Sequence, residues 1–146
     1  MRKHPVSWLV LAAIAATSAT AVAADAKALY QQAFVREVRS SFAQLLVAKG
    51  SVGAPGQPEF EKKLDAIVDV VSGCHMRSLE FFSEPIRQQT YAVVAKGGSY
   101  ADAKQTMNTL LAAEGVAGGA REAAMKKMVV NSVDYGKTCM SAMPAF

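Results

Sequence analysis

The chain has 146 residues, of which 51% are hydrophobic and 19% charged, and this length fits one domain rather than two. Its formal net charge is only +4, and the basic doublets beyond residue 24, Lys62-Lys63 and Lys126-Lys127, lack the aromatic or arginine-rich flanks that favour nucleic-acid binding. We therefore expect these doublets to lie on solvated helix faces, and we expect no nucleic acid among the partners.

Residues 1–24 have the pattern of a secretory signal peptide that is removed after export. Two basic residues near the start precede an apolar run over residues 8–16, and small residues then lead to a cleavage site after Ala23 or Ala24. All 12 acidic residues and all but two of the 16 basic residues follow this segment, so the predicted domain over residues 25–146 carries a net charge of +2.

The remaining sequence contains no second export or anchoring signal. No later stretch approaches the ~20 consecutive apolar residues that a membrane helix requires, so we expect no stable membrane insertion. No cysteine lies near the cleavage site, where lipid attachment would need one. We therefore predict a free periplasmic or secreted protein.

From Asp25 onward, apolar residues recur at intervals of three and four, which is typical of amphipathic helices. The pattern predicts an all-α fold, a compact bundle of about five amphipathic helices in a single domain. Residues 49–58, KGSVGAPGQP, form the longest predicted loop, which is either the most mobile segment or a plain connector. The first helix is expected over residues 25–49, with an apolar stripe of Val35, Val38, Phe42, Leu45 and Leu46.

The second helix is expected to begin at Pro58 or Glu59, because proline suits a first helical turn and acidic residues complement the positive helix start. The apolar periodicity continues as far as Phe82, and His75 lies within the apolar arc. The residues of this arc are Phe60, Leu64, Ile67, Val68, Val71, Cys74, Leu79 and Phe82.

Start and stop signals predict three further helices. The third begins at Ser83-Glu84-Pro85 and stops at Gly97-Gly98. The fourth begins at residues 99–102, SYAD, where a serine precedes an acid by three residues as in a capping box. The fifth is expected over residues 120–143. Its less polar face consists of Met125, Met128, Val129, Ser132, Gly136, Cys139, Met140 and Met143.

Cys74 and Cys139 are the two cysteines of the chain, and an exported protein folds in an oxidising compartment. We therefore predict a disulfide between them, which makes the second and fifth helices neighbours. In the chain-entropy model, a bridge that closes a loop of about 65 residues stabilises the fold by ~4 kcal/mol.

His75 is the one histidine beyond residue 24, and its position beside Cys74 does not fit known Cys-His chemistry. Covalent haem needs C-x-x-C-H, but residue 71 is valine. Neighbouring helical side chains point about 100° apart, which does not suit a Cys-His nucleophile pair, and structural zinc needs four ligands. We predict no catalytic residues and no cofactor. His75 is expected to be a core or boundary residue, or alternatively a pH-sensitive contact that charges near pH 6.

The fifth predicted helix contains two M-x-x-M pairs, Met125 with Met128 and Met140 with Met143. Thioethers bind copper(I), so these four residues are candidate metal ligands. The pairs lie about 22 Å apart along a helix, so each pair supplies only two ligands. Methionine as a flexible filler of the core is the favoured interpretation.

These features favour a non-enzymatic module that binds a protein partner, with Phe81 and His75 as candidate contact residues. Phe81 lies at the edge of the apolar arc, where a side chain reaches the surface. In size, export signal, helical content and single disulfide, the chain is similar to small periplasmic proteins that bind other proteins, including immunity proteins, inhibitors and stress chaperones. The alternatives are a carrier of copper or of a small hydrophobic ligand, and an enzyme with His75 as general base. A homodimer is also compatible with the sequence.

Overall fold

The computed structural model describes residues 9–50 and 52–143, with side chains described from Val22 onward. The described part contains helices and no strands. The elements are α1 (Leu9–Lys49), α2 (Pro58–Ser78), the short 3₁₀ helix η1 (Leu79–Phe81), α3 (Glu84–Ala95), α4 (Tyr100–Val116) and α5 (Gly119–Met140). The predicted all-α bundle of five helices with one disulfide is confirmed.

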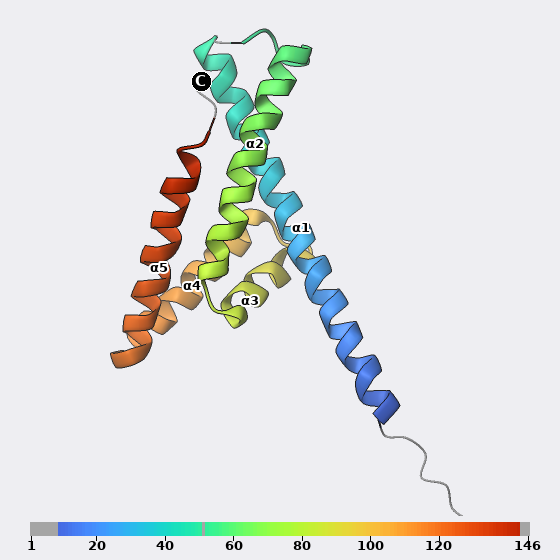
Figure 1. The fold of residues 1–146 in the computed structure, drawn as a ribbon, viewed down its shortest axis with the longest axis vertical. Helices are drawn as coiled ribbons and strands as arrows, with labels where there is room; N and C mark the ends of the chain where they lie inside the picture. Colours follow the sequence, from blue (N-terminus) through green and yellow to red (C-terminus); the bar gives the residue numbers. More distant parts are fainter. Residues whose placement is uncertain (1–8, 51, 144–146) are drawn as a thin grey trace, which may run out of the picture.

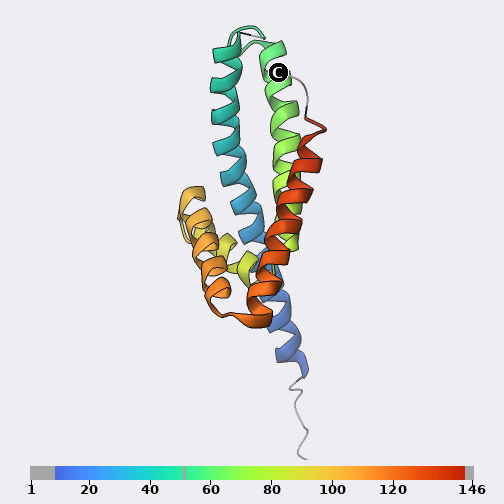
Figure 2. The ribbon, with the colours of Figure 1, turned by 90° about the vertical axis from the view of Figure 1, so that its left-hand side faces the viewer.

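The first two helices form a long antiparallel hairpin, and the other three pack against it (Figure 1). α5 runs along α2 towards the α1–α2 loop, whereas α3 and α4 lie at the opposite end of α2 (Figure 2). α1 contacts α2, α3 and α4, while α5 contacts α2, η1 and α4. Among the residues with described positions, no helix combines the length and the apolar character needed to span a membrane.

Two hydrophobic clusters hold the helices together. The hairpin cluster lies between α1 and α2, and the lower cluster joins α1 and the end of α2 to α3 and α4. Tyr100 packs against both clusters. The buried members of the hairpin cluster are Phe34, Val38, Leu46, Phe60, Leu64, Ile67, Val68 and Val71. Those of the lower cluster are Ala26, Tyr30, Met76, Leu79, Phe82, Ile86, Tyr91 and Ala103.

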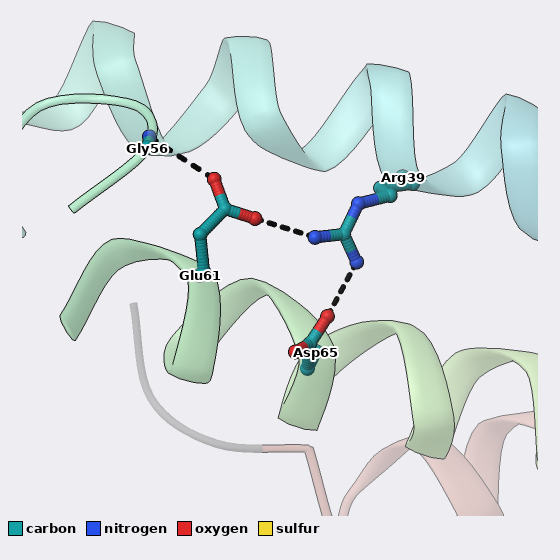
Figure 3. A network of polar contacts seen from close by, with 4 residues as sticks. All are labelled: Arg39, Gly56, Glu61 and Asp65. Atoms are coloured by element: carbon teal, nitrogen blue, oxygen red, sulfur yellow. Dashed lines mark hydrogen bonds and ion pairs between the residues drawn. The ribbon is translucent and has the colours of Figure 1, made fainter. Parts of the chain in front are cut away.

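An ion-pair network fastens the hairpin near its loop (Figure 3). The Arg39 guanidinium on α1 donates to Glu61 at 2.5 Å and to Asp65, both on α2. The second carboxylate oxygen of Glu61 accepts from the backbone N–H of Gly56 in the loop at 3.1 Å. Because Arg39 is only half-buried and Asp65 is exposed, each pair adds at most about 1 kcal/mol, but the network fixes the loop to the start of α2.

The helix ends differ from the prediction at three places. α1 begins at Leu9 rather than at Asp25, because the alanine-rich sequence before Asp25 has high helix propensity. The predicted signal peptide thus lies partly outside the described residues and partly in the first turns of α1. α2 ends at Ser78 rather than Phe82, because η1 turns the chain with a Phe82 N–H to Leu79 C=O bond of 3.0 Å. α5 ends at Met140 rather than Met143.

The predicted face of α5 is its less exposed side, but Ser132 is its only buried residue. The other members of that face are half-buried. The reason is that α5 packs against α2, η1 and α4 from one side only, without contacting α1 in the described part of the chain. α5 is therefore an outer helix whose attachment depends on few buried contacts.

The end of α3 and the start of α4 follow the local sequence signals. Gly97 has φ +92°, and the N–H groups of Gly97 and Gly98 bond the carbonyls of Val94 and Val93 at 2.9 Å each. This is a Schellman motif, which satisfies carbonyls at the helix end. The Ser99 hydroxyl accepts from the Asp102 N–H at 3.1 Å, and the Ser99 N–H donates to the Asp102 carboxylate at 2.8 Å. The predicted capping box is therefore confirmed.

Substitution of Ser99 by alanine is expected to lower the free energy of unfolding by about 1 kcal/mol, since the Asp102 N–H loses its partner at the start of α4. Urea unfolding monitored by circular dichroism measures the change. Asn108→Ala, an exposed change inside the same helix, is the matched control and should be neutral or slightly stabilising. Equal destabilisation by both substitutions would contradict the role of the cap.

Candidate functional site

The disulfide joins α2 to α5, as predicted. The Cys74 and Cys139 sulfurs are 1.99 Å apart and the Cα atoms 5.6 Å apart. Cys74 is buried, whereas Cys139 is half-buried on the outer helix. The bridge is therefore the covalent link between the core of the bundle and its outer helix.

His75 lies next to the disulfide inside a cluster of aromatic rings. Its Nε2 atom is 2.9 Å from the Tyr30 hydroxyl, and its ring stacks on Phe34 with centroids 3.9 Å apart. The Tyr100 ring meets the imidazole edge-on at a centroid distance of 6.0 Å. His75 is half-buried and held by α1 and α4, so its orientation is fixed by packing from two other helices.

Burial decides the protonation state of this cluster. It lowers the pKa of His75 from 6.5 to about 4, well below the value near 6 expected from the sequence. Burial also raises the pKa of Tyr30 above its ordinary value, and the neighbouring Tyr100 adds to this effect. At neutral pH the site thus contains a neutral imidazole and neutral phenols.

Tyr91 and Tyr100 both pack against the ring of Tyr30, although both lie far from Tyr30 in the sequence. The centroid of the Tyr30 ring lies 5.0 Å from that of Tyr91 and 5.7 Å from that of Tyr100. Tyr30 and Phe34 are four residues apart and therefore lie on one face of α1. This spacing is the local sequence signal that indicates an aromatic face on this helix.

Two hollows flank the disulfide, one on each side of the seam between α2 and α5. We call the first the His75 pocket. It measures about 250 Å³ and is lined by Phe34, Val71, Cys74, His75, Ser78, Gly136 and Met140. The second, the Arg77 pocket, measures about 350 Å³ and is lined by Asp69, Val70, Gly73, Cys74, Arg77, Cys139 and Ala142. The Arg77 pocket has charged walls, whereas the lining of the His75 pocket carries no charged side chain.

Phe81 reaches the surface, where the sequence places it. Its side chain is 39% exposed, and its ring lies against Tyr135 of α5 with centroids 5.5 Å apart. The neighbouring Leu79 and Phe82 are buried, so η1 is anchored on both sides of Phe81. Phe81 is exposed on η1, whereas His75 is half-buried on α2. No contact between these two residues is observed among the described side chains.

Three of the four candidate metal-ligating methionines pack against the hydrophobic clusters, whereas the fourth, Met125, lies beside Gly115 of α4. Met128 packs against the lower cluster, whereas Met140 and Met143 pack against the hairpin cluster. Met140 shares the lining of the His75 pocket with the imidazole. Among the described residues, no group of three His, Cys, Asp or Glu side chains is placed to hold a metal ion. A copper site built on these thioethers stays a prediction.

The groups around the His75 pocket are suited to binding. A neutral imidazole, a serine hydroxyl and a thioether line a mainly apolar hollow that opens to the surface. The aromatic cluster, which holds the imidazole, joins four of the five helices through Tyr30, His75, Tyr91 and Tyr100.

No protein-family model, curated protein or solved structure matches this chain.

Proposed function

We propose that this chain is an exported, non-enzymatic helical protein of the periplasm or the extracellular space that binds a protein partner through the surface around Phe81. Two features support export. Residues 1–24 have the signal-peptide pattern, and the first buried side chain of the described part is Ala26, so cleavage after Ala23 or Ala24 leaves both clusters intact. The disulfide fits an oxidising compartment.

The observation that carries the binding proposal is the exposed Phe81 ring lying against the half-buried ring of Tyr135. A phenylalanine with 39% of its surface exposed has apolar area that a partner can bury. Aromatic residues are enriched in the few positions that dominate protein interfaces. The pair spans η1 and α5, which places it across two elements that contact each other.

The support beneath this pair is rigid, which favours binding. The Leu79 carbonyl accepts from the Phe82 N–H at 3.0 Å, and both residues are buried in or beside the lower cluster. The disulfide holds α5, and therefore Tyr135, against α2. A side chain that is already positioned loses little conformational entropy when a partner binds.

Phe81→Ser is expected to weaken binding of the partner at least tenfold, since loss of a central aromatic contact is worth about 1.4 kcal/mol or more. The test captures partners from periplasmic extract with the tagged, oxidised protein, identifies proteins recovered in stoichiometric amounts, and then titrates the purified partner. A second copy of this chain, recovered as partner, would indicate a homodimer through the same surface.

Val47→Ser is the matched control. Val47 is 54% exposed, and it lies near the loop end of the hairpin, at the far end of α2 from η1 (Figure 1). The control should retain the affinity of the parent protein. Equal affinity of Phe81→Ser and the parent for every identified partner would rule out this surface.

A further inference from the structure

The His75 pocket has the size and walls of a site for one small ring. Its volume of about 250 Å³ has room for one small ring, and the hollow is open to the surface, whereas the apolar cavity of about 150 Å³ that binds benzene in an engineered protein is enclosed. Its walls include the Phe34 ring, the Val71 side chain and the sulfur-containing side chains of Cys74 and Met140. Methionine sulfur makes favourable contacts with aromatic rings. The absence of charged side chains in this lining favours an uncharged ligand.

Gly136 keeps one wall of the pocket open. It lies within α5 without a positive φ, and a Cβ atom added to it would meet no atom within 4 Å apart from its chain neighbours and the nearby backbone of its own helix. Glycine in a helix is destabilising by roughly 0.5–1 kcal/mol relative to alanine. Neither a turn nor a close approach requires glycine at this position, so the structural effect of Gly136 is the space it leaves beside His75.

His75 supplies a positioned polar group in this apolar wall. Its Nε2 atom is occupied by the Tyr30 hydroxyl, and its ring is stacked on Phe34. Its Nδ1 atom has no hydrogen-bond partner in the part of the chain that the structure describes. In a neutral imidazole one ring nitrogen donates and the other accepts, so Nδ1 is a donor or an acceptor according to the tautomer that Tyr30 selects. A hydroxyl group, which both donates and accepts, pairs with either tautomer.

We propose that the His75 pocket binds a small, uncharged phenol, with its ring between Phe34, Met140 and the wall left open by Gly136 and its hydroxyl on His75. Binding of this ligand does not depend on the proposed binding of a protein partner at the Phe81 surface. The site needs no metal and no covalent step. Its fixed imidazole and preformed apolar walls are the usual features of a small-molecule site.

The probes are 4-methylphenol and toluene, which have the same ring and methyl group but differ in the hydroxyl. Each is titrated into the oxidised, exported protein by calorimetry, and binding is located by the NMR signals of the Met140 methyl group and the His75 ring. We expect saturable binding of 4-methylphenol at least fivefold tighter than that of toluene, with shifts at both residues.

Gly136→Leu fills the pocket and is expected to weaken 4-methylphenol binding at least tenfold. Gly73→Leu is the matched control, because Gly73 is also a helical glycine with open space around its Cβ position but lines the Arg77 pocket across the disulfide. This control should retain the affinity of the parent. Thermal unfolding of both variants shows that they are folded.

Three results would overturn the proposal. The first is no saturable binding of 4-methylphenol to the parent protein. The second is equal loss of binding in folded Gly136→Leu and Gly73→Leu, which would place the ligand elsewhere. The third is toluene binding as tightly as 4-methylphenol, which would show that no hydrogen bond between His75 and the hydroxyl group contributes to binding.

Discussion

Replacement of Cys74 and Cys139 together by alanine is expected to lower the free energy of unfolding by about 4 kcal/mol. The reason is that the bridge closes a loop with a sequence separation of 65, which restricts the unfolded chain. For a domain whose total stability is of the order of 5–15 kcal/mol, this is a large share. Guanidinium unfolding of the oxidised parent and the double variant measures the difference.

The loss should be concentrated in the outer helix. Ser132 is the only buried residue of α5. In the double variant, the amide hydrogens of α5 are therefore expected to exchange much faster than the amide hydrogens of α2. The reduced parent protein is the matched control and should unfold at the same denaturant concentration as the double variant. Coincidence of all three unfolding curves would show that the bridge contributes nothing to stability.

Acidification from pH 7 to pH 4 is expected to destabilise the protein through His75 by at most about 3 kcal/mol. Burial lowers the pKa of His75 to about 4 in the folded state, against 6.5 in the unfolded chain. Between these values the unfolded chain binds a proton that the folded protein excludes, so stability is full above pH 6.5 and falls as the pH approaches 4. Each pKa unit corresponds to about 1.4 kcal/mol.

His75→Gln is the matched variant for this experiment, since its amide keeps a hydrogen-bonding group near Tyr30 but does not titrate. The neighbouring phenols of Tyr30 and Tyr100 stay neutral over this range, because their pKa values are raised by burial. Asp102 and Glu114, whose pKa values are lowered by hydrogen bonds from Ser99 and Arg121, contribute equally to parent and variant.

Urea unfolding at pH 7 and at pH 4.5 should therefore show a larger stability difference for the parent than for His75→Gln. NMR titration of the His75 ring in the folded protein gives an independent measurement, with a midpoint near pH 4. A midpoint near 6.5 would show that the ring is hydrated and would remove the physical basis of this prediction.

Local chemistry allowed most helix boundaries to be predicted from the sequence. Pro58 starts α2, Gly97 ends α3, and the Ser99–Asp102 capping box starts α4, because each signal acts on neighbouring backbone groups. The disulfide also followed from the sequence, since the chain has two cysteines and therefore one possible intramolecular pairing. These predictions required no knowledge of how distant helices pack.

The aromatic cluster could not be predicted in this way. Tyr30, Tyr91 and Tyr100 come from three different helices, and periodicity shows only which face of a helix is apolar, not which faces meet. The same limitation explains α5, whose apolar face is clear from the sequence although the buried part of it is small. The His75 pocket arises from Gly136 on one helix facing an imidazole on another, which is a relation between helices.

Apart from Ser132, the buried residues of the described part of the chain lie outside α5. Every buried member of the hairpin cluster belongs to α1 or α2, and every buried member of the lower cluster lies between Ala26 and Ala103. Both clusters are therefore complete without a buried residue of α5. The bridge ties Cys139 of α5 to the buried Cys74 of α2. The disulfide thus retains a helix that contributes little to the buried core.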